Sequence, residues 1–92
     1  MTESQVKKAV AFYQDFMTRH MVPNIKCTSF NAKSVSSEVA LAHAHSMLDE
    51  IDKMLVAGRL DRASSLLHFA QGILWTLGEF SLEELNSHNR SI

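Results

Sequence analysis

A chain of 92 residues with 46% apolar and 21% charged residues is enough for one small domain. Its formal net charge of −1 argues against binding of duplex nucleic acid, which normally requires a strongly basic patch. One cysteine excludes an internal disulfide, and the sequence shows neither a signal-peptide pattern nor an apolar run long enough to span a membrane. We therefore expect a cytoplasmic protein that does not contact a membrane.

Charge is distributed unevenly along the chain. Residues 1–35 contain five Lys or Arg and two acidic residues, whereas residues 36–92 contain four Lys or Arg and eight acidic residues. Opposite ends of different copies can therefore attract one another. A chain of this size also buries only a small core, so burial of surface between copies would add stability. Both observations favour a homo-oligomer.

The first helix is predicted at about residues 3–21. Thr2 and Gln5 have the spacing of a capping box, and Pro23 prevents the helix from continuing. Its apolar residues recur with helical spacing and predict a buried stripe, with Phe12 on its flank: Val6, Ala9, Val10, Tyr13, Phe16, Met17 and Met21.

Residues 22–36 lack helical periodicity and are rich in Asn, Ser and Thr, which predicts a loop. The loop is long for a compact helical domain, and such long connections often have a function.

Two further helices are predicted at about 37–57 and 60–77, separated by Gly58 and followed by Gly78. Two apolar-striped helices joined by so short a turn should form an antiparallel hairpin. Ser81 and Glu84 form a second capping box for a short helix at about 82–87, after which the tail 89–92 is expected to fray. The fold class predicted for residues 1–92 is a single all-α domain, with a central helix hairpin, three main helices and a short fourth.

The helix at 60–77 has an unusual tryptophan. Its core stripe contains Leu60, Ala63, Leu67, Ala70, Leu74 and Leu77, with Leu66, Phe69 and Ile73 widening it. Trp75 projects away from this stripe, near His68 and beside Gly72, and a large aromatic there needs a cover. Glycine inside a helix costs about 1 kcal/mol relative to alanine, which suggests a close backbone approach. Trp75 is expected to be covered either by a helix of a partner protein or of another subunit, or by another helix of the same chain.

A second candidate lies in the loop, where Lys26, Thr28, Phe30 and Lys33 combine charge, hydroxyl and aromatic groups. The lysines can offset phosphate charge, and Phe30 or Tyr13 can stack on a base, so a nucleotide-sized anion is a possible ligand. The alternative is a solvated polar loop with Phe30 in the core.

The sequence gives little support for a catalytic site or a metal-binding site. His45, Asp49 and Asp52 share one side of the helix at 37–57, but no second histidine is in register, so a solvated acidic face is the expected reading. Cys27 lacks the sequence context of a nucleophile. We therefore expect no enzyme activity, no metal site and no cofactor.

The C-terminal part resembles small accessory proteins of tailed bacteriophages. The resemblance rests on Gly58-Arg59-Leu60-Asp61-Arg62-Ala63, on Phe69 to Trp75, on Ser81-Leu82-Glu83-Glu84-Leu85 and on Asn89-Arg90. It implies a non-enzymatic, anti-defence protein that binds and inhibits a host protein, with Trp75, Gly72, His68, Phe12 and Phe16 as the partner-binding residues.

A looser resemblance is to phage anti-CBASS cyclic-nucleotide sponges, which are helical oligomers that bind their ligand between subunits. It implies that Tyr13 stacks on a base and that Lys26 and Thr28 contact phosphate. A structural or scaffolding subunit is a further alternative.

Overall fold

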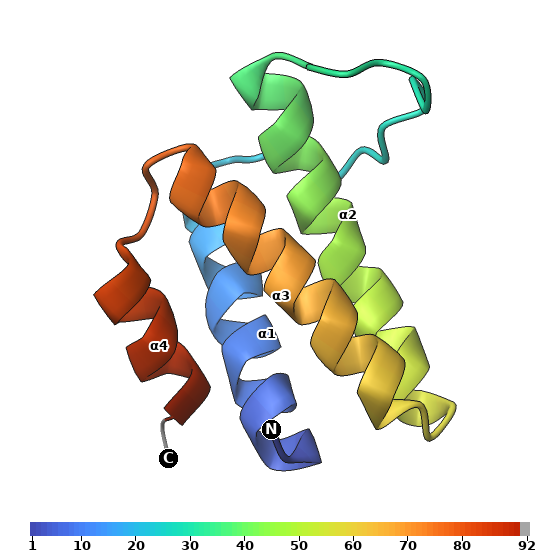
Figure 1. Cartoon of the computed structure of the whole chain (residues 1–92), viewed down its shortest axis with the longest axis vertical. Helices are drawn as coiled ribbons and strands as arrows, with labels where there is room; N and C mark the ends of the chain where they lie inside the picture. The colour runs from blue at the N-terminus through green and yellow to red at the C-terminus, as the bar shows by residue number, and fades with distance from the viewer. Residues whose placement is uncertain (91–92) are drawn as a thin grey trace.

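The structure, a computed structural model, describes residues 1–90 and in this range consists of four helices without strands. They are α1 (Glu3–Arg19), α2 (Ser37–Val56), α3 (Leu60–Thr76) and α4 (Leu82–Arg90). Figure 1 shows α2 and α3 as an antiparallel hairpin, with α1 packed against it and α4 beside α1. The predicted all-α class and central hairpin are confirmed. No helix in residues 1–90 is long and apolar enough to cross a membrane.

The core lies where the apolar stripes of α1, α2 and α3 meet. Each stripe is buried because residues at alternating steps of three and four face the same side of a helix. The largest fully buried side chains are Tyr13, Met17, Leu48, Ile51, Leu67, Leu74, Val6 and Val10. Leu85 of α4 completes this cluster.

Helix α1 ends at Arg19, before the predicted end of the stripe. Met21 has a positive φ of 54°, and the Val22 N–H donates to the Met17 carbonyl at 2.9 Å, which closes the helix. The Met21 side chain is 82% exposed. The prediction that Met21 extends the buried stripe is therefore wrong, because the left-handed turn directs it outward.

Helix α4 is longer than predicted and includes Asn89 and Arg90, whereas Ser91 and Ile92 lie outside the described residues. Its last turn is held by a polar contact with α3, in which the Gln71 amide donates to Asn89 Oδ1 at 2.7 Å and accepts from Asn89 Nδ2 at 3.1 Å. The expectation that Asn89 and Arg90 fray is therefore wrong.

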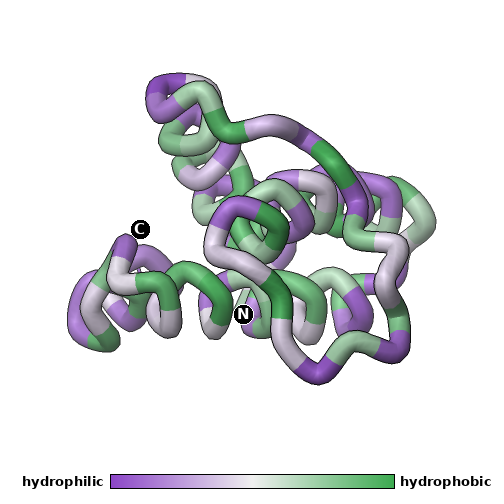
Figure 2. Tube along the Cα trace, turned by 90° about the horizontal axis from the view of Figure 1, so that it is seen from above, coloured by the Kyte–Doolittle hydropathy of each residue, from purple (hydrophilic) through white to green (hydrophobic). Residues whose placement is uncertain are grey.

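The long loop is tied to α2 along its first half. Cys27 N–H donates to Nδ1 of His43 at 3.1 Å, and Nδ1 of His45 donates to the Val22 carbonyl at 3.0 Å. The second half of the loop is exposed throughout. Figure 2 shows apolar and polar residues interspersed along it.

Candidate functional site

Two aromatic side chains stand exposed on the outer face of α3. Trp75 is 50% exposed and Phe69 is 61% exposed, and neither α1 nor α4 covers them. Phe69 was expected to widen the core stripe, and this expectation is wrong. A step of two residues turns a helix by about 200°, so Phe69 points away from Leu67, which fills the core.

These aromatic residues border an apolar hollow at one end of the hairpin. Figure 1 shows α2 and α3 diverging with distance from their short turn, so that the start of α2 and the end of α3 are separated. The hollow lies at this open end and is lined by one residue of α2, five residues of α3 and the residue that follows α3: Ala40, Phe69, Gly72, Ile73, Trp75, Thr76 and Leu77.

Gly72 lies in this hollow without a packing reason within the chain. A Cβ atom added at Gly72 would have no other atom within 4 Å, apart from its immediate helical surroundings. No neighbouring backbone therefore requires a glycine, although glycine costs about 1 kcal/mol inside a helix. The close approach predicted at Gly72 does not occur within the described chain.

A second hollow continues from Phe69 towards the turn of the hairpin. Phe69 lines both hollows, and Lys26 from the loop reaches the second one. We call the two together the seam groove, since they follow the contact line between α2 and α3. Its second part is lined by Asn24, Lys26, His43, Ser46, Met47, Asp49, Glu50, Lys53, Met54, Arg62, Leu66 and Phe69.

The carboxylates of the second hollow are already engaged. Asp49 accepts from Nδ2 of Asn24 at 3.0 Å, and Glu50 lies 3.4 Å from the Lys53 ammonium group. Lys26 and Arg62 have no ion-pair partner in the part of the chain that the structure describes. The seam groove is therefore apolar at the Trp75 end, and its second part has two cations without an ion-pair partner within residues 1–90, Lys26 and Arg62, against one such carboxylate, Asp49.

The remaining predicted partner-binding residues lie outside this groove. Phe16 is buried in the core, and Phe12 packs on His88 of α4 with ring centroids 4.5 Å apart. His68 is exposed on α3 but does not line either hollow. The aromatic residues of α1 therefore do not form one surface with Trp75.

The residues predicted to bind an anion are not brought together. Tyr13 is fully buried, and its hydroxyl lies 2.7 Å from Nδ1 of His88 and accepts from Gln71 at 2.9 Å. Its ring therefore offers no face to a base. Phe30 is 80% exposed, and neither Phe30 nor Lys33 lines a hollow with Lys26.

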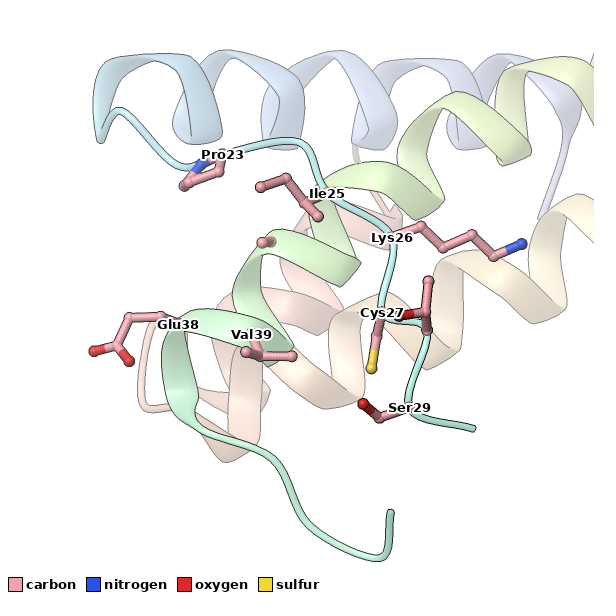
Figure 3. A pocket seen from close by; sticks show the side chains of 9 residues that line it. Pro23, Ile25, Lys26, Cys27, Ser29, Glu38 and Val39 are labelled. Atoms are coloured by element: carbon pink, nitrogen blue, oxygen red, sulfur yellow. The ribbon is translucent and has the colours of Figure 1, made fainter. Parts of the chain in front are cut away.

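Lys26 and Thr28 do line a hollow beneath the loop, with Ile25, Val39 and Glu38. Figure 3 shows the Lys26 side chain extending away from Val39 and Glu38, so its ammonium group is not directed into this hollow. A phosphate there would meet mainly apolar side chains and one carboxylate.

Several polar residues of α2 were considered as metal ligands or catalytic groups, and in the structure they make contacts that hold the fold together. His45 and Asp49 hold the loop, and Asp52 accepts from Gln14 at 3.3 Å. Cys27 contacts His43 through its backbone N–H. Within residues 1–90, no group of three His, Cys, Asp or Glu side chains has an arrangement that could hold a metal ion.

Sequence reasoning did not identify Arg62, Ile73 or Ala40 as parts of an exposed groove. Arg62 precedes Phe69 by seven residues and therefore shares its side of α3, a signal that the sequence contained. The role of Ala40 depends on how far α2 and α3 diverge, which the sequence does not specify. Comparison of the chain with models of protein families, with curated proteins and with solved structures found no match.

Proposed function

We propose that this chain is a non-enzymatic binding protein that acts by docking the seam groove onto another protein. The observation that carries the proposal is Trp75, which is left half exposed by residues 1–90 and lies beside Phe69 and Gly72 at an apolar hollow. Exposed tryptophans that border apolar hollows are typical anchors of protein interfaces. Given the resemblance to phage accessory proteins, we propose a host protein as the target and its inhibition as the consequence, in the host cytoplasm.

Replacement of the anchor tests this function. Trp75→Ala should weaken partner capture by about 30-fold or more, the usual loss at an interface anchor, while the helical circular dichroism is retained. Phe30→Ala is the control, because it removes an even more exposed aromatic side chain that lies outside the groove. If Trp75→Ala captured the partner protein as well as the unaltered chain does, the seam groove would not be the binding site.

The nucleotide sponge is the alternative: Lys26 and Thr28 both line one hollow, although the Lys26 ammonium group points out of it. It predicts that Lys26→Ala weakens binding of a cyclic or linear nucleotide in calorimetry, with no contribution from the buried Tyr13 ring. Native mass spectrometry tests this alternative together with the proposed homo-oligomer: a multimer with a bound mass of nucleotide size supports both. A multimer without such a mass leaves a scaffolding role as the competing function.

A further inference from the structure

We infer that the seam groove takes an amphipathic helix of the partner protein, with apolar side chains over Trp75 and Phe69 and carboxylates over Arg62 and Lys26. This inference rests on the proposed function and adds the chemistry of the partner.

The shape of the groove matches a helix. From Arg62 to Thr76 the groove runs along α3, and at 1.5 Å per residue this corresponds to about 20 Å, or roughly four helical turns. A helix of that length presents a stripe of apolar residues at steps of three and four, which is the usual way in which helices occupy apolar grooves. Gly72 leaves room in the wall for a large partner side chain.

The charged side chains that line the groove determine which polar residues the partner helix should carry. Glu50 is paired with the Lys53 ammonium group, whereas Asp49 keeps its negative charge because its partner Asn24 is neutral. Asp61, the neighbour of Arg62, is bound by Arg59 at 3.3 Å. Arg62 from α3 and Lys26 from the loop together outweigh Asp49, so this part of the groove carries a net positive charge that carboxylates of the partner would match.

Lys26 reaches this position because of the loop. The hydrogen bond from the Cys27 backbone to His43 fixes the loop beside α2, and Lys26 precedes it directly. In Figure 3 the Lys26 side chain leaves the hollow beneath the loop. The loop and α3, which appear as separate candidates in the sequence, thus contribute to one groove.

The test is a selection of binding peptides on the immobilised chain. The probe is a display library of helical peptides in which the apolar stripe and both ends are randomised. Enriched peptides should combine an apolar stripe with Asp or Glu at one end, and Trp75→Ala should abolish their binding. Arg62→Glu should weaken binding about tenfold, and exchange of the peptide's acidic residues for Lys should restore it. Lys33→Glu, the same charge change outside the groove, should leave binding unchanged.

The other outcomes separate the inference from the proposed function. Peptides that depend on Trp75 without acidic preference, or without response to Arg62→Glu, would overturn the acidic partner and leave the protein-binding groove intact. If no enriched peptide depended on Trp75 for binding, both the acidic helical partner and the protein-binding role of the groove would be contradicted. Sedimentation that shows Trp75-dependent self-association, competing with the peptides, would assign the groove to a second copy of this chain and overturn the inference.

Discussion

The hydroxyl of Tyr13 lies 2.7 Å from Nδ1 of His88, and so connects α1 to a helix 75 positions further along the chain. Because the hydroxyl oxygen accepts from Gln71, its hydrogen is free to be donated to His88. In this arrangement Nδ1 of His88 is the acceptor and carries no hydrogen. Gln71 extends this contact to Asn89, so one polar network joins α1, α3 and α4.

Loss of the Tyr13 hydroxyl should destabilise the fold. In Tyr13→Phe, one N–H of Gln71 and Nδ1 of His88 lose their partner in a partly buried site, at a cost of about 1–3 kcal/mol. Urea unfolding followed by circular dichroism measures this loss. Ser65→Ala removes an exposed hydroxyl and should change stability by less than about 0.5 kcal/mol. Equal stability of Tyr13→Phe and the unaltered chain would contradict a structural role for the network.

The stability of the fold should fall in mild acid. Burial lowers the pKa of His88 below its usual 6.5, with Glu84 opposing part of this effect. The unfolded chain therefore binds the proton more readily than the folded chain. The contribution of His88 is complete above about pH 6.5 and is lost as the pH falls from there through the lower folded pKa.

Unfolding midpoints in urea between pH 7.5 and 5 measure this dependence. His88→Gln, which does not titrate, should show a smaller loss of stability over this interval than the unaltered chain. Identical pH profiles of the two proteins would contradict the assignment to His88. By contrast, Tyr13 stays neutral throughout, since burial raises its pKa to about 12.

Gly72→Ala should stabilise the isolated chain. The added methyl group meets open space, and alanine is favoured over glycine inside a helix by about 1 kcal/mol. Thermal unfolding should shift upward by about 4–8 °C. Gly78→Ala is the control with the opposite sign, because Gly78 has a φ of +77° that alanine adopts only with strain. A destabilised Gly72→Ala would show that the glycine serves the fold itself.

Met21→Gly should also stabilise the fold. Met21 adopts a positive φ, which costs a residue with a side chain about 1–2 kcal/mol, and glycine avoids this cost. Greater freedom of glycine in the unfolded chain offsets part of the gain, so we expect about 0.5–1 kcal/mol in urea unfolding. A loss of stability would show that the largely exposed Met21 side chain contributes packing that outweighs the strain.

The hairpin could be predicted from the sequence because its causes are local. Helical spacing of apolar residues and Gly58 with its φ of +75° define α2, α3 and their turn within a short stretch of chain. Most of the core follows from the same spacing, as Leu67 and Leu74 show. Trp75 was likewise correctly placed outside the core stripe.

The site could be predicted only in part because it depends on relations between helices. Tyr13 was assigned to a ligand from its aromatic character, whereas its hydroxyl meets Gln71, a residue 58 positions away. Phe69, by contrast, was assigned to the core although helical spacing alone directs it away from Leu67, so its exposure could have been predicted from the sequence. Lys26 joins Arg62 through the path of the loop, which no periodicity describes.

The position of α4 also sets an order of events during folding. The α2–α3 hairpin needs only neighbouring segments, so it can form early. The contacts of Tyr13 in α1 with Phe80 and His88 join segments far apart in the chain, and closing them costs more entropy. A partly folded chain therefore has the aromatic face of α1 uncovered while the α2–α3 hairpin is already formed. Of the four described helices, α4 docks last, and the interval before it docks is when the chain is most prone to aggregate.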